Sequence, residues 1–98
     1  MKERARVMLF VQAPDAERST LEEAYHRVST SLKGTPGLLR NELLRSCSQP
    51  ASYVVLSEWE SLEAFRRWEQ GPVHRGSTPD PMRRYTTGVA FYEVLGAY

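Results

Sequence analysis

The sequence predicts one α+β domain whose strands and helices follow the order β-α-β-β-α-β. Three observations support this prediction: four short runs rich in β-branched and aromatic residues, two amphipathic stretches with three- and four-residue spacing, and turn residues between them. The 98 residues leave room for one hydrophobic core, so we expect residues 1–98 to form a single domain.

The first half of the chain predicts a strand, a helix and a second strand. Residues 6–11 form a short apolar run that reads as a strand buried on both faces. Residues 19–22, Ser-Thr-Leu-Glu, fit a capping box, and Gly34 can adopt the left-handed conformation that ends a helix, so we expect a helix over about 19–33. The second strand is expected at 38–45.

The second half predicts a strand, a helix and a last strand. Residues 53–59 are the clearest strand, joined to the preceding one by a hairpin turn. Ser61 is a good N-cap for a second amphipathic helix, and this helix ends at residues 71–72, Gly-Pro. The stripe that makes the helix amphipathic consists of Leu62, Phe65, Trp68 and Glu69.

Residues 73–85 are irregular and are expected to form a lid or a pair of short helical turns, before a fourth strand at 86–95. The whole order is ferredoxin-like, with both crossovers right-handed, so both helices should cover one face of a four-stranded antiparallel sheet.

The other face of this sheet is expected to be a homodimer interface. The strands at 53–59 and 86–95 carry apolar side chains on both sides, and an exposed apolar face of that size is unusual for a monomer. Burial of ~400 Å² of apolar surface per subunit would contribute on the order of 10 kcal/mol before association costs are subtracted.

Composition excludes several classes of protein. Hydrophobic content of 41% and charged content of 26% are those of a globular protein, and no apolar run is long enough to cross a membrane. The net charge of +1 gives no basic surface for nucleic acid. Residues 1–6 show no signal-peptide pattern, so we expect a cytoplasmic protein. One cysteine and two histidines do not suggest a metal site.

The stretch from Tyr53 to Arg75, together with residues 34–37, Gly-Thr-Pro-Gly, resembles the antibiotic biosynthesis monooxygenase family of the dimeric α+β barrel superfamily. The resemblance implies a pocket in each subunit between sheet and helices, away from the dimer interface. Members include cofactor-free oxygenases that convert anthrones to quinones, and haem-degrading oxygenases. In the cofactor-free branch a deprotonated anthrone or phenol itself passes an electron to molecular oxygen. The protein then supplies an apolar pocket and a hydrogen bond for the enolate, and no cofactor.

The resemblance assigns roles to two tryptophans. Trp59 matches a tryptophan that lines the pocket of anthrone-oxidising members and can donate its indole N–H to a substrate oxygen; core packing is the alternative. Val55 and Phe65 stand where those members carry an asparagine and a tyrosine. Trp68 matches a tryptophan of the haem-degrading branch, but that branch's iron-binding histidine falls at about Thr78, which disfavours haem degradation and favours core packing for Trp68.

Several further side chains are candidates for the site. His74 could act as a base near neutral pH, or lie on the surface. A tyrosine could handle the proton instead, since Tyr53, Tyr85 and Tyr92 could each offer a phenol to an enolate. By the period of two, Ser57 shares a strand face with Trp59. We predict Trp59 and His74 as catalytic residues, and as substrate-binding residues Tyr53, Val55, Ser57, Phe65, Trp68, Tyr85 and Tyr92.

The leading hypothesis from sequence is therefore a cofactor-independent monooxygenase that oxidises an aromatic polyketide-type substrate, an anthrone or phenol, in secondary-metabolite biosynthesis. A cofactor-free isomerase or cyclase of the same superfamily is an alternative. A non-catalytic accessory or binding subunit is the third, and the absence of the asparagine and tyrosine favours it.

Overall fold

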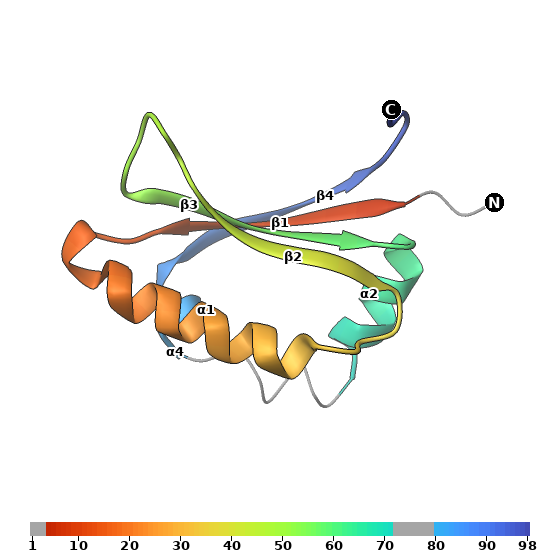
Figure 1. Cartoon of the computed structure of the whole chain (residues 1–98), viewed down its shortest axis with the longest axis horizontal. Helices are drawn as coiled ribbons and strands as arrows, with labels where there is room; N and C mark the ends of the chain where they lie inside the picture. Colours follow the sequence, from red (N-terminus) through yellow and green to blue (C-terminus); the bar gives the residue numbers. More distant parts are fainter. Residues whose placement is uncertain (1–3, 72–79) are drawn as a thin grey trace.

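The computed structural model describes residues 4–71 and 80–98, and it confirms the predicted order of the main elements (Figure 1). Two short helical segments, η1 and α4, are added to that order. The elements are β1 (Ala5–Gln12), η1 (Asp15–Glu17), α1 (Arg18–Leu32), β2 (Leu38–Arg45), β3 (Ser52–Trp59), α2 (Leu62–Glu69), α4 (Asp80–Tyr85) and β4 (Thr86–Glu93).

The four strands form one antiparallel sheet in the order β2-β3-β1-β4. The helices α1, α2 and α4 all lie on the same side of it, as the right-handed crossovers predict (Figure 1). The ferredoxin-like α+β fold is therefore confirmed. Within the single chain the sheet is open, with β2 and β4 at its edges. No helix in the described part of the chain is both long and apolar enough to span a bilayer.

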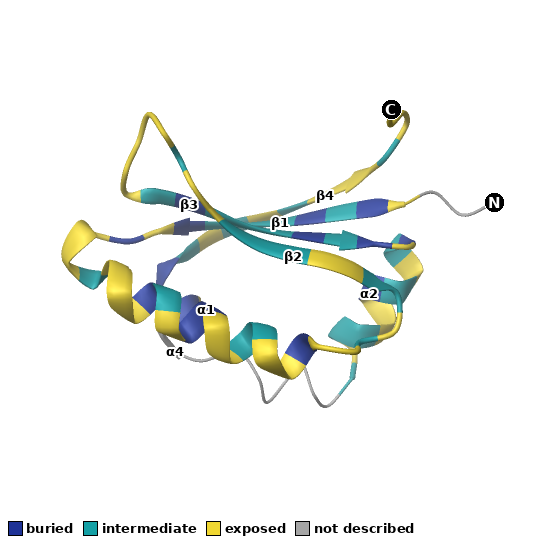
Figure 2. Ribbon diagram, in the orientation of Figure 1, coloured by how far each residue is buried: buried dark blue, intermediate teal, exposed yellow. Residues whose placement is uncertain are grey.

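The two faces of the sheet differ in burial. On the helix-covered face Val11 and Trp59 are almost fully buried, at 0% and 1% exposed (Figure 2). On the opposite face Met8 and Leu56 are only half-buried, and Tyr92 is 53% exposed. The prediction that the first strand is buried on both faces is wrong for the single chain, because all described helices cover the same side.

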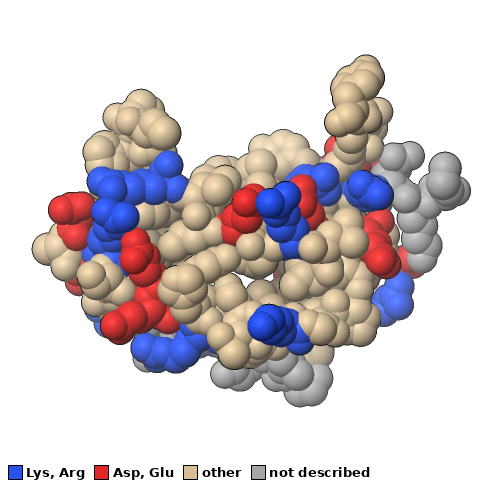
Figure 3. Space-filling model, in the orientation of Figure 1, with Lys and Arg blue, Asp and Glu red and all other residues tan. Residues whose placement is uncertain are grey.

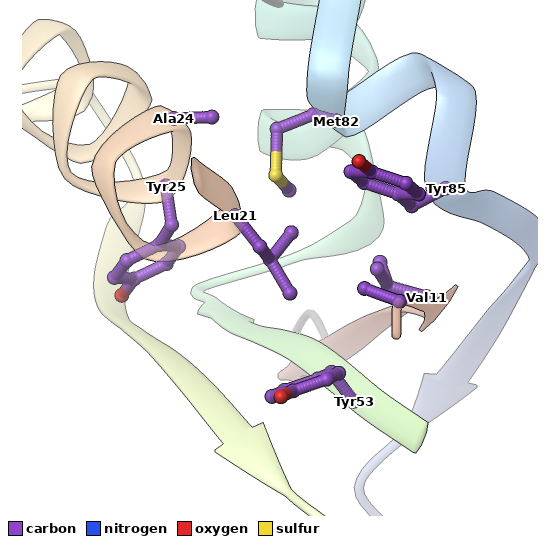
Figure 4. Close-up of a cluster of buried hydrophobic side chains, with 8 residues drawn as sticks. Val11, Leu21, Ala24, Tyr25, Tyr53, Met82 and Tyr85 are labelled. Carbon is purple, nitrogen blue, oxygen red and sulfur yellow. The ribbon is translucent and has the colours of Figure 1, made fainter. Parts of the chain in front are cut away.

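Two clusters of buried side chains join helices to sheet, one at each end of it. The first packs residues of α1 and α4 against β1 and β3, including Val11, Leu21, Tyr53, Met82 and Tyr85 (Figure 4). The second packs α2 against the other end through Ala5, Val7, Trp59 and Phe65. Each cluster anchors one end of the helical layer to the sheet. The cavity described below lies between the sheet and this helical layer.

The predicted capping box at the start of α1 is wrong. The helix begins at Arg18 after the η1 turn, so Ser19 lies inside its first turn, and the N-cap residue Glu17 makes no side-chain cap bond. Arg18 instead pairs with Glu22 one turn later, with its Nε 2.9 Å from the carboxylate. The predicted cap of α2 is confirmed, since the Ser61 hydroxyl accepts a hydrogen bond from the backbone of Ala64 at 3.2 Å.

The predicted irregular segment 73–85 lies partly outside the described residues. Its described end, Asp80–Tyr85, is helical, which agrees with the short-turn alternative. The strand β4 follows at once and ends at Glu93, two residues before the predicted boundary.

Gly37 holds the turn into β2 close to α2, which leads to a prediction on stability. Both Gly34 and Gly37 have a positive φ, +81° and +84°, but only at Gly37 would an added Cβ overlap the side chain of Ala64. We expect Gly34→Ala to cost about 1–2 kcal/mol for the left-handed backbone alone. Gly37→Ala should cost about 1–3 kcal/mol more, because it also creates overpacking.

Urea unfolding of the two variants measures this difference. The overlap is tested by adding Gly37→Ala to an Ala64→Gly background, where the extra cost should fall to that of Gly34→Ala. Equal losses for the two glycine variants in the wild-type background would contradict the close approach of this turn to α2.

Candidate functional site

A cavity of about 260 Å³ lies between the helix-covered face of the sheet and the helices α1, α2 and α4. Its described lining is mostly apolar, because the inward positions of β1 and β3 carry aliphatic side chains and the inward stripes of the helices close over them. The aliphatic and thioether side chains that line it are Val7, Leu9, Val28, Leu32, Val55, Met82 and Val89. Such a lining keeps the inside of the cavity poor in water and strengthens any polar contact made there.

Trp59 forms one wall of this cavity and is only 1% exposed. Its ring packs edge-on against Phe65, with ring centres 5.4 Å apart, and lies tilted against Trp68 at 5.7 Å. The indole N–H donates a hydrogen bond to the Ser57 hydroxyl oxygen at 2.8 Å. The family resemblance implies that this indole N–H donates to a substrate oxygen, but in the structure it already donates to Ser57.

The Ser57 hydroxyl is consequently the hydrogen-bond donor that faces the cavity beside Trp59. It is buried, and its own contact is a long one to the backbone oxygen of Val7, at 3.5 Å. A bond of that length is weak. Acceptance from the indole polarises the hydroxyl and makes it a better donor to a ligand oxygen.

Asn41 is the second polar group on this face. It pairs with Ser57 in the register of β2 and β3, so the two side chains are direct neighbours on the inward side. Its Oδ1 atom is buried and has no hydrogen-bond partner among residues 4–71 and 80–98. Asn41 and Ser57 thus form a polar pair in an otherwise apolar wall.

Glu69 supplies the one carboxylate in the described lining. It is the last residue of α2 and is half-buried. The described lining holds no histidine: His26 is exposed on α1, and His74 lies outside the described residues. Nor do the described residues gather three or more side chains of the types that bind metals.

Of the residues predicted from sequence, five lie together around the cavity: Val55, Ser57, Trp59, Phe65 and Trp68. Tyr53 and Tyr85 pack instead into the buried cluster around Val11 and Leu21, because that end of the sheet is closed by α1 and α4 (Figure 4). Tyr92 points to the uncovered face, since it is the neighbour of the inward Phe91 in β4.

Tyr85 also differs chemically from the phenol that a base would require. Interaction with the Glu17 carboxylate, and next the loss of solvent on packing, raise the pKa of the Tyr85 phenol above its usual value of 10.0. Both effects make the Tyr85 phenol a weaker acid than that of an exposed tyrosine.

Sequence reasoning missed Asn41 and Glu69 as site residues. A signal existed for Glu69, which sits on the apolar stripe of α2 four residues after Phe65. For Asn41 the alternation of β2 is interrupted by a register shift between Leu38 and Arg40, so its inward position follows only from the pairing with β3.

Comparison with known proteins agrees with the fold. A family model described as antibiotic biosynthesis monooxygenase matches residues 5–77. The chain belongs to this family.

Two curated relatives match most of the chain. Protein SchA of Streptomyces halstedii is 31% identical over 71 residues, which is 72% of this chain but 19% of SchA, so the chain spans about a fifth of that relative's length. A mycobilin-producing heme oxygenase of Mycobacterium tuberculosis is 30% identical over 88 residues, 87% of this chain and 84% of the enzyme.

Solved structures show the same fold in both branches. An alanine variant of SnoaB, a cofactor-independent oxygenase from Streptomyces nogalater, superposes with a TM-score of 0.80 at 22% identity, over 99% of this chain and 97% of that one. A heme-degrading protein from Mycobacterium tuberculosis gives the same TM-score and identity over 100% and 98%.

Proposed function

We propose that this family member is a cofactor-independent monooxygenase that oxidises an anthrone or electron-rich phenol of aromatic polyketide type in secondary metabolism. The observation that supports this most strongly is the Ser57 hydroxyl, polarised by Trp59 and directed to an apolar cavity. An enolate oxygen in such a cavity would accept a strong hydrogen bond, because the surrounding medium screens it poorly.

The reaction requires only the substrate and molecular oxygen to balance. Removal of a proton from the anthrone gives an enolate, whose electrons reduce oxygen; the ring methylene becomes a carbonyl, and water is released. Ser57 holds the enolate oxygen, and Trp59 fixes the Ser57 hydroxyl in place. The aromatic side chains Phe65 and Trp68 pack against the ring system and keep water out.

Glu69 is the group that we propose as proton acceptor. A general base must lie in the cavity wall, within reach of the substrate proton. Glu69 meets this requirement because it is the carboxylate of the described lining. The histidine predicted from sequence for this role, His74, remains the alternative.

The dimensions and lining of the cavity support a reaction without haem. About 260 Å³ is just below the usual size of ligand pockets and is nearer to the size of a three-ring substrate than to that of a porphyrin. Of the side-chain types that bind haem iron, the described lining holds Met82 and Tyr25 but neither histidine nor cysteine. The position matched to the iron-binding histidine, Thr78, lies outside the described residues.

The cavity also bears on the two alternatives. A core filled by side chains would favour a non-catalytic accessory subunit. The open space between sheet and helices therefore disfavours the accessory role. An isomerase or cyclase would use the same enolate-binding groups without oxygen. Incubation of the protein with an anthrone in air and under nitrogen separates the reactions: quinone formation only in air supports the oxygenase, and conversion at the same rate under nitrogen contradicts it.

We further propose that the uncovered sheet face pairs two copies into a homodimer. Met8, Phe10, Val54 and Leu56 form an apolar patch at its centre, where each is only half-buried within the single chain. A second copy would bury this patch and leave the cavity on the opposite side undisturbed.

A charge in the middle of this patch should abolish association. We expect the wild-type protein to elute as a dimer and Leu56→Lys as a monomer, measured by size-exclusion chromatography with light scattering. Leu39→Lys is the matched control, because Leu39 is an exposed leucine at the register shift of β2, outside the patch. A Leu56→Lys variant that stays dimeric would place the interface elsewhere.

A further inference from the structure

We propose that Asn41 and Ser57 form a paired site for two neighbouring oxygens, which selects an aromatic ketone that carries a hydroxyl group next to its carbonyl. This inference rests on the proposed function, because it names the class of substrate for the same cavity. It assigns to Asn41 a role in positioning and specificity.

The pairing of β2 with β3 fixes the two side chains next to each other. Asn41 and Ser57 are register partners, and both line the cavity. Side chains of such partners point the same way, with Cβ atoms about 4.5–5.5 Å apart. They can therefore contact adjacent oxygens on one edge of a planar ligand.

The buried oxygen of Asn41 indicates that the pair is incomplete without a ligand. Its Oδ1 atom has lost contact with solvent and has no partner in the described residues. Buried carbonyl oxygens are nearly always hydrogen-bonded, because the cost of removing them from water is otherwise not recovered. A hydroxyl group on the ligand would donate the missing bond.

Asn41 also lies where the cavity meets the surface. It lines a second hollow, of about 280 Å³, between the end of α1 and β2, together with Ser29 and Lys33. Figure 3 shows the molecular surface open between β2 and α1. A ligand bound in the cavity would thus direct its oxygen-bearing edge toward this opening and its apolar rings toward Phe65 and Trp68.

The chemistry of the two groups defines the ligand. Ser57 accepts a bond from Trp59, and its O–H makes only the long contact to the backbone oxygen of Val7, so this O–H can donate to a carbonyl or enolate oxygen instead. The Asn41 amide oxygen matches a hydroxyl donor. A carbonyl flanked by a phenolic hydroxyl presents these two groups side by side, whereas an unsubstituted ring ketone presents only the first.

Binding of two quinones that differ only in these hydroxyls tests the pair. The probes are dantron, whose central carbonyl is flanked by hydroxyls, and unsubstituted anthraquinone. Both tryptophans of the chain line the cavity, so quenching of their fluorescence reports occupancy without any turnover. We expect the wild-type protein to bind dantron about tenfold more tightly, the value of one ordinary hydrogen bond.

Asn41→Leu should bring the ratio of the two affinities close to one while leaving the affinity for anthraquinone nearly unchanged. Gln12→Leu is the control, because it also removes an amide from a strand but lies outside the cavity lining. Since Asn41→Leu removes an unpaired buried group, we expect its melting temperature to equal or exceed that of the wild type.

A tenfold ratio that persists in Asn41→Leu, or the absence of any preference in the wild type, would overturn the inference. A preference that disappears in Asn41→Leu supports it even if no variant consumes oxygen. In that case the oxygenase proposal fails while the paired binding site is supported. Failure of the proposed function and failure of the paired site are therefore distinguishable.

Discussion

Glu69→Gln is expected to reduce the turnover of an anthrone by about 10²–10⁴-fold, the usual contribution of a positioned general base. The amide keeps the size of the carboxylate at the end of α2, so the cavity should keep its shape, and binding of a quinone should change little. Steady-state kinetics should therefore show a loss in kcat with a nearly constant KM.

His74→Gln is the matched comparison for this result. The same replacement of an ionisable group by an amide tests the base predicted from sequence. We expect it to leave kcat within about threefold of the wild type, well below the loss on removing a general base. A large loss in His74→Gln with little effect of Glu69→Gln would exchange the two roles and contradict the assignment of Glu69.

Trp59→Phe is expected to lower kcat by about tenfold through Ser57. The variant keeps an aromatic ring against Phe65 but removes the indole N–H that holds the Ser57 hydroxyl. Hydrogen-bonded chains polarise one another, so loss of the first bond weakens the second. The free energy of unfolding should fall by about 1–3 kcal/mol, because the smaller ring leaves space in the core.

A double-mutant cycle separates this role from simple packing. If Trp59 acts through Ser57, the losses in kcat for Trp59→Phe and Ser57→Ala should not add, and the double variant should be no slower than Ser57→Ala alone. Trp68→Phe is the control for packing, since Trp68 lines the same cavity. If the losses in kcat add, or if Trp68→Phe loses as much kcat as Trp59→Phe, Trp59 has only a structural role.

The fold could be predicted from sequence because its signals are local. The strand at β3, the cap at Ser61 and the left-handed glycine at 34 each depend on nearby residues, and the structure contains all of them. The start of α1 could not be predicted in the same way. The hydroxyls at 19 and 20 match a capping pattern, but the preceding η1 turn extends the helix beyond them.

The site was less predictable because it depends on which side chains meet across the sheet. The alternation of β3 correctly placed Val55, Ser57 and Trp59 on one face. It could not show that the Trp59 indole would bond to Ser57, two residues earlier on the same strand, or that Asn41 would stand beside Ser57. Both facts depend on rotamers and on strand register after a bulge, which no local pattern in the sequence encodes.

Oxygen uptake by the purified, metal-free protein with dithranol tests the central proposal most directly. We predict saturable uptake well above that of buffer, accompanied by quinone formation and reduced about tenfold in Trp59→Phe. Uptake no faster than in buffer, by a protein that is folded and binds dantron, would contradict an oxygenase and leave a binding or isomerase role for the cavity.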